Sequence, residues 1–162
     1  MSDSDLLASY LNDHLTGATG GMELARRLAD AHPSGEDSAR LRQLAHDVAE
    51  DRAALIGILE RLDITVDQVK VAMGWIGEKL ARLKLNGYLF SRSPLSTVIE
   101  LEGMRLGVEG KASGWRTLRS VAEHDERLET AELDRLIERA ADQIETLEAL
   151  RVNAVRQVFV DQ

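Results

Sequence analysis

The stretch Ser93–Lys111, SPLSTVIELEGMRLGVEGK, decides the fold, because it opens a long helix and places charge within its apolar side. Serine before Pro94 is a strong signal for the start of a helix. The serine side chain can accept a hydrogen bond from a free backbone N–H of the first turn, and proline suits the first helical position. Apolar residues then recur at three- and four-residue steps, as in an amphipathic helix. The pattern predicts a helix from Pro94 to about Val121.

Two glutamates of this helix fall on its apolar side. At about 100° per residue, Glu102 and Glu109 lie near the middle of the apolar arc. That arc is defined by Leu95, Val98, Ile99, Leu101, Leu106, Val108 and Ala112. We therefore expect both glutamates in the core. An isolated buried carboxylate is too costly to keep charged, so it must pair, bind a cation or take up a proton.

The same spacing predicts three more long helices and leaves strand signals almost absent. The first runs from about Ser4 to His32, the second from about Glu36 to Leu62, and the last is capped by Thr130. A fifth, shorter helical segment lies between Thr65 and Ser93. Short turns make two antiparallel hairpins, while the middle segment is long enough to travel the length of the bundle. We predict an all-α, up-down-down-up four-helix bundle with a helical crossover between helices two and three.

Composition limits the class of protein. The 162 residues with 44% hydrophobic content suit one domain, covering residues 1–162. No apolar run is long enough for a membrane span, and the start of the chain lacks the features of a signal peptide, so we expect a cytoplasmic protein. The absence of cysteine excludes thiolate chemistry, and a net charge of −8 argues against nucleic acid or membrane as a partner.

The chain resembles the ferritin-like superfamily, whose four-helix bundles use a long crossover between helices two and three. The resemblance covers nearly the whole chain and is architectural. The phrases that carry it are YLNDHLTGATGGMELARRLAD, RLKLNGYLFSRSPLSTVIELEGMRLGVEGK and ELDRLIERAADQ, which look like a bacterial branch of such bundles. The resemblance implies the fold, and it brings no particular reaction with it.

The di-iron signature of that superfamily is missing on three of the four helices. It requires inward glutamates on helices one and three and a Glu-x-x-His on helices two and four. Here His14 takes the inward place on the first helix, Glu50 is followed three residues later by Ala53, and Glu145 by Glu148. We therefore expect no bound metal and no cofactor.

Arginines are predicted to neutralise the two inward glutamates. The apolar arcs place Arg52 inside the second helix's face, Arg151 at the centre of the last helix's face and His14 at the centre of the first. Arg52 lies level with Glu109 along the bundle, and Arg151 lies level with Glu102. The favoured interpretation is a buried ion-pair network that fixes helix register. Alternatively, a pocket for a small polar or anionic ligand is lined by these ionisable side chains together with Tyr10 of the first helix; its candidate residues are Tyr10, His14, Arg52, Glu102, Glu109 and Arg151.

Four glycines form a stripe beside the apolar arc. They are Gly103, Gly107, Gly110 and Gly114. Each glycine costs up to about 1 kcal/mol relative to alanine in a helix interior, so close backbone packing is the expected compensation. We predict that the crossover segment, which contains Gly74 and Gly77, packs along the stripe. A second copy of the chain and a bend of the helix are the alternatives.

Two functions of different classes follow from these features. The leading hypothesis is a non-catalytic binding or interaction module that forms a homo-oligomer, in the simplest case a dimer. The alternative is a divergent metal-dependent oxidoreductase or metal-storage bundle that uses Glu102, Glu109 and His14.

Overall fold

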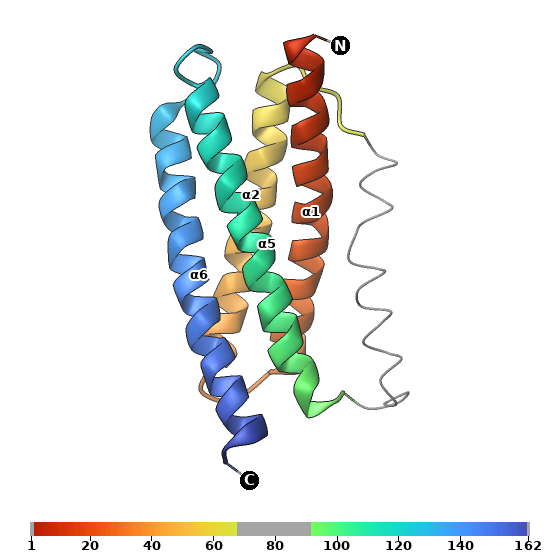
Figure 1. Ribbon diagram of the computed structural model, residues 1–162, viewed down its shortest axis with the longest axis vertical. Helices are drawn as coiled ribbons and strands as arrows, with labels where there is room; N and C mark the ends of the chain where they lie inside the picture. Colours follow the sequence, from red (N-terminus) through yellow and green to blue (C-terminus); the bar gives the residue numbers. More distant parts are fainter. Residues whose placement is uncertain (1, 68–91, 162) are drawn as a thin grey trace.

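The computed structural model describes residues 2–67 and 92–161. Four helices occupy most of these residues: α1 (Asp3–Ala31), α2 (Ser38–Arg61), α5 (Pro94–Val121) and α6 (Thr130–Phe159). No strand occurs in the described ranges. Figure 1 shows the helices packed side by side as a bundle. The prediction of an all-α four-helix protein is confirmed, and the predicted bounds agree with the observed ones to within two residues.

The helix starts are set by local side-chain chemistry. Ser93 has an extended backbone and accepts a hydrogen bond from the Leu95 N–H at 3.3 Å, and Pro94 is the first helical residue, as predicted. The predicted cap at Thr130 is wrong. Glu129 has the extended backbone of the cap position, and Thr130 already belongs to the helix. A capping side chain must precede the first helical residue, because its own backbone is non-helical.

The two hairpins are joined mainly through α1 and α5. Helix α1 packs along α2, and α5 packs along α6, while contacts between α2 and α6 are sparse. In Figure 1, α1 runs down from the N-terminus, α2 returns, α5 runs in the same direction as α2, and α6 returns again. The end of α2 and the start of α5 therefore lie at opposite ends of the bundle. The predicted crossover helix, including Gly74 and Gly77, lies outside the described residues.

Asn12 holds the chain that follows α2 against α1. Its side chain is buried, and the amide nitrogen donates to the carbonyl oxygens of Ala8 at 3.0 Å and Thr65 at 3.1 Å. The amide oxygen accepts from the Asp67 N–H at 2.7 Å. A buried amide must satisfy both its donors and its acceptor. Because Asn12 does so with residues on both sides of Val66, it fixes the path of the chain that follows α2.

The core follows a seven-residue repeat in α2 and α6. Buried positions alternate at three- and four-residue steps, the spacing of a seam between coiled helices. On α6 they are Leu133, Leu136, Ala140, Gln143, Leu147, Leu150 and Ala154. On α2 they include Leu41, Leu44, Val48, Asp51, Leu55 and Ile58. Near the middle of the two helices, the polar residues Gln143 and Asp51 therefore occupy core positions. Within the described ranges, none of the helices combines the length and apolarity needed to cross a bilayer.

Candidate functional site

Glu102 and Glu109 are exposed, so the prediction that they lie in the core is wrong. The Glu102 side chain is 53% exposed and that of Glu109 is 46% exposed. The arc that placed them inward included Leu95 and Leu106, which are themselves exposed. Without these two leucines, the buried face of α5 turns toward Leu101, Met104, Val108, Ala112 and Trp115. The glutamates then lie to one side of it.

One of the two predicted ion pairs forms, but on the surface. Arg151 lies 3.8 Å from Glu102, as predicted, and pairs more closely with Glu148 at 2.7 Å. Glu109 instead lies 4.0 Å from Arg105 on its own helix. Solvent-exposed ion pairs contribute about 0 to 1 kcal/mol to the free energy of unfolding. These two pairs are therefore not the buried ion-pair network that was predicted.

Arg52 also takes a different partner from the predicted one. Its Nε donates to the Thr19 hydroxyl on α1 at 3.0 Å, and the Thr19 hydroxyl in turn donates to the Leu15 carbonyl at 2.9 Å. The Arg52 side chain is half-buried. Its predicted pairing with Glu109 is wrong, because Glu109 faces the Arg105 side of α5.

The buried ionic cluster is centred on Asp51, whose side chain is 1% exposed. Arg139 Nε donates to Asp51 Oδ1 at 2.7 Å, and Gln143 Nε2 donates to Oδ2 at 2.9 Å. Lys111 Nζ donates both to Asp51 Oδ2 and to Gln143 Oε1. These four residues come from three helices, α2, α5 and α6. A buried ion-pair network of the predicted kind is therefore present, but it is built from other residues.

Burial acts strongly on the Lys111 ammonium. Loss of water lowers the pKa of Lys111, although the Asp51 carboxylate opposes the shift. Removing an ammonium from water is expensive, and only close anionic and polar partners repay that cost. The cluster holds two cations against one carboxylate, and Arg139 is partly open to solvent. The arrangement links α2 to the α5–α6 hairpin in one register.

The signal for this cluster was in the sequence but was ambiguous. In α6 the adjacent residues Leu136 and Ile137 are both apolar, so an apolar stripe with a seven-residue repeat can be drawn through either of them. The side with Ile137 leads to Ile144 and Arg151, while the observed side leads to Gln143. In α2 the same one-residue choice separates Arg52 from Asp51. Both sides alternate by three and four residues, so the spacing alone does not choose between Asp51 and Arg52.

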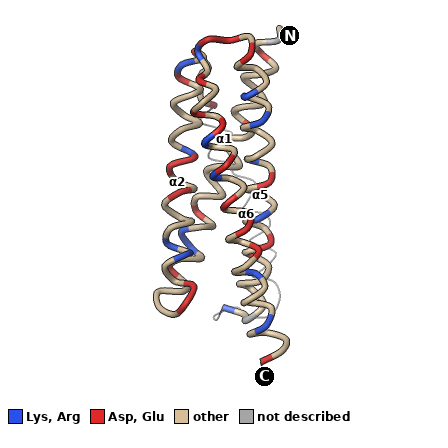
Figure 2. Tube along the Cα trace, turned by 90° about the vertical axis from the view of Figure 1, so that its left-hand side faces the viewer, with Lys and Arg blue, Asp and Glu red and all other residues tan. Residues whose placement is uncertain are grey.

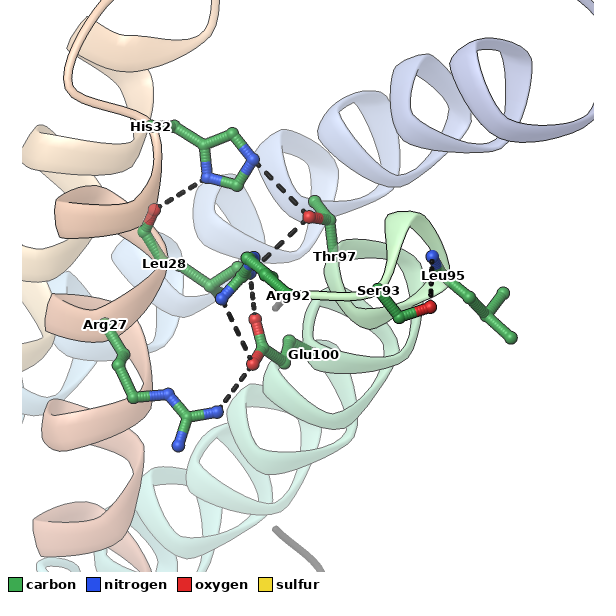
Figure 3. A network of polar contacts seen from close by, with 8 residues as sticks. All are labelled: Arg27, Leu28, His32, Arg92, Ser93, Leu95, Thr97 and Glu100. Atoms are coloured by element: carbon green, nitrogen blue, oxygen red, sulfur yellow. Dashed lines mark hydrogen bonds and ion pairs between the residues drawn. The ribbon is translucent and has the colours of Figure 1, made fainter. Parts of the chain in front are cut away.

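A second ionic cluster joins the start of α5 to the end of α1 (Figure 3). The Glu100 carboxylate is buried and accepts from Arg27 of α1 at 2.6 Å and from both terminal nitrogens of Arg92. Nearby, His32 Nε2 lies 3.4 Å from the Thr97 hydroxyl. Glu100 therefore holds residue 92 against α1 at the end of the bundle opposite Asn12.

A groove of about 800 Å³ lies between α1, α2 and α5. Its wall is mainly apolar and includes Leu11, Ala18, Leu24, Leu55, Ile99, Met104 and Leu106. Glycines from α1 and α5 form much of the rest, and Asp51, Lys111 and Arg52 line it from the polar side. Of the predicted pocket residues, Tyr10, His14 and Arg52 line the groove, whereas Glu102, Glu109 and Arg151 do not.

His14 and Tyr10 pack from α1 onto α5 at one end of the groove. Their rings meet edge to face with centroids 4.5 Å apart, and Tyr10 Oη lies 3.1 Å from the Thr117 hydroxyl. The His14 ring lies against Gly114, where an added Cβ would be 3.0 Å from the ring. Burial lowers the pKa of His14, with the Asp13 carboxylate opposing the shift. The folded protein therefore favours the neutral ring.

The glycine stripe divides into two kinds of position. At Gly114 the close neighbour is the His14 side chain of α1, whereas the predicted packing of the crossover segment lies outside the described residues. At Gly103, Gly107 and Gly110, an added Cβ would meet no described atom within 4 Å. These three glycines line the groove instead. Within the described residues, their small size makes space and does not accommodate a neighbour.

The residues of the metal hypothesis do not converge. Glu102 and Glu109 lie beside Arg151 and Arg105, whereas His14 packs against Gly114 on the α1 side. Within residues 2–67 and 92–161, no group of three or more histidines and carboxylates is placed to hold a metal ion. Figure 2 shows acidic and basic residues interspersed along the helices.

Comparison of the chain with models of known families, with curated proteins and with solved structures finds no match.

We predict that Asp51→Asn lowers the free energy of unfolding by about 3 to 5 kcal/mol, because it leaves the largely buried Lys111 ammonium and the partly exposed Arg139 without an anion. Urea denaturation measures the change. Asp134→Asn is the control, since that carboxylate pairs with Arg119 and is 59% exposed. Adding Lys111→Met to Asp51→Asn should restore part of the loss. Equal, small losses in both single variants would contradict a central role for Asp51.

Alanine substitutions should separate the two kinds of glycine. Gly107→Ala is expected to raise the free energy of unfolding by up to about 1 kcal/mol, because alanine is the better helix former and meets no described neighbour. Gly114→Ala should instead lower it by about 1 kcal/mol or more, because His14 must move. Thermal and urea unfolding test both. Destabilisation by Gly107→Ala would indicate that another segment or a second copy packs on the stripe.

Stability should fall on mild acidification because of His14. Its folded-state pKa lies below the unfolded value of 6.5, so protonation favours the unfolded chain. The free energy of unfolding should therefore decrease as the pH drops through and below 6.5. His14→Gln should make this decrease shallower, as measured by urea unfolding at a series of pH values. His46→Gln, on the exposed side of α2, is the control. Parallel curves for wild type and His14→Gln would exclude this role.

Proposed function

We propose that this chain is a non-catalytic binding protein with a ferritin-like four-helix topology, and that the groove between α1, α2 and α5 is its ligand site. The observation that carries the proposal is the groove itself. A volume of about 800 Å³ lies within the range of roughly 300 to 1,000 Å³ that is usual for small-molecule sites. Its mainly apolar wall with a few polar groups is also typical of such sites.

The ionic cluster supports a binding role and not a redox one. In a metal-containing bundle, inward carboxylates and histidines converge on a metal ion. In this chain the Lys111 ammonium instead donates hydrogen bonds to the buried Asp51 and Gln143. A fixed ammonium satisfies the buried carboxylate without metal. The same direction of α2 and α5 in Figure 1 supports the ferritin-like topology.

A neutral fluorescent dye, N-phenyl-1-naphthylamine, tests the proposal. We expect saturable binding of one dye per chain with enhanced fluorescence, because the groove wall is mainly apolar. Gly107→Leu should lower the affinity by about tenfold or more, since its side chain would occupy the groove. Gly57→Leu is the matched control, because Gly57 also has free space beside it but does not line the groove.

Two outcomes would contradict a ligand site in the groove. One is the absence of saturable dye binding by the folded protein. The other is an equal loss of affinity in Gly107→Leu and Gly57→Leu, which would place the dye elsewhere. Circular dichroism of both variants establishes that they remain folded.

A further inference from the structure

Arg52 is a cation in the groove wall that pairs with no carboxylate of residues 2–67 and 92–161. Its Nε donates to the Thr19 hydroxyl, and its other guanidinium nitrogens make no hydrogen bond within residues 2–67 and 92–161. The Thr19 hydroxyl is itself held by the Leu15 carbonyl. Thr19 thus holds the guanidinium through its Nε, and the two terminal nitrogens can still donate hydrogen bonds to a ligand. A half-buried arginine with free donors is suited to a carboxylate or phosphate, since its fork matches their geometry.

Among the described residues that line the groove, the neighbouring charges leave Arg52 as the available cation. Lys111 is engaged by Asp51 and Gln143. The carboxylates of Asp51 and Glu100, which also line the groove, are engaged by basic side chains. Asp13, the remaining carboxylate of the wall, is exposed. An anionic group beside Arg52 would therefore meet one unneutralised positive charge.

Trp115 provides a second, independent polar group in the wall. It is 3% exposed, and its indole N–H is buried without an acceptor in the described part of the chain. A buried donor without a partner is unfavourable, so a ligand acceptor there would be favoured. Positions along α1 give the spacing of the two groups. Trp115 lies near the level of His14, because the preceding residue, Gly114, packs against the His14 ring. Arg52 lies at the level of Thr19, five residues further along α1. The two polar groups are thus about 8 Å apart along the bundle axis.

The geometry points to an amphipathic monocarboxylate as the ligand of this groove, with its carboxylate on Arg52 and its apolar body along the glycine-lined wall toward Trp115. This inference rests on the proposed binding function. A carboxylate is favoured over a phosphate because a single guanidinium carries one charge, while a phosphate monoester carries close to two and the other cations of the wall are engaged. Acceptor atoms further along the ligand would be bound by the Trp115 N–H.

Isothermal titration calorimetry with octanoate, 1-octanol and octyl phosphate tests the inference. We expect octanoate to bind about tenfold or more tightly than octanol, which has the same chain length but no charge. Arg52→Gln should abolish that preference and leave octanol binding unchanged, while Arg52→Lys should keep part of it. Arg40→Gln, on the exposed surface of α2 away from the groove, should behave as wild type.

Carbon-13 NMR of carboxyl-labelled octanoate gives a readout that a purely structural role of Arg52 would not change. The pKa of the bound carboxyl should be lowered in the wild type and in Arg40→Gln, and should return toward the free value in Arg52→Gln. Equal affinities for octanoate and octanol, or a preference that survives Arg52→Gln, would overturn the inference and leave the binding function standing.

The other outcomes are equally decisive. Tighter binding of octyl phosphate than of octanoate would overturn the carboxylate assignment in favour of phosphate. Binding of none of the three compounds, together with no dye binding, would overturn the binding function itself and indicate that another part of the chain or a second copy fills the groove.

Discussion

A single buried carboxylate, Asp51, constrains the centre of this bundle. It lies on α2 at a position where a coiled seam normally has an apolar residue, and it cannot remain charged there alone. Lys111 from α5 and Arg139 and Gln143 from α6 supply the partners. Since a shift of one helix along another would separate these groups, the cluster selects one register among the several that apolar packing alone allows.

The same cluster defines the polar side of the groove. Lys111 and Asp51 line it, so the groove has an apolar wall of leucines and glycines on one side and fixed charges on the other. The glycines of α1 and α5 keep that space open among the described residues. At the two ends, Asn12 and Glu100 hold the chain on either side of residues 68–91 against α1 and α5. Fixed points of this kind would preorganise the proposed site, because they would leave little to move when a ligand binds.

Much of the fold could be predicted from the sequence, whereas the composition of the buried cluster could not. Helix bounds follow from local signals such as Ser93 before Pro94 and the glycine turn at Gly35, which has a positive φ of 108°. Which of two adjacent residues faces inward depends on the partner helix. Thus Gln143 rather than Ile144, and Asp51 rather than Arg52, occupy the seam, although each pair is separated by only about 100° of rotation.

The sequence by itself determined an all-helical chain of long amphipathic helices, their ends, and the presence of charge among apolar residues, because these depend on local propensity and periodicity. Only the tertiary structure decided where those charges go. Leu106 is 68% exposed, which the apolar pattern of α5 alone could not indicate. The buried face of α5 is therefore rotated away from Leu106, and Glu102 and Glu109 lie outside the core. Packing between helices fixes the inward direction, and that direction separates a surface ion pair such as Glu102–Arg151 from a buried one such as Asp51–Lys111.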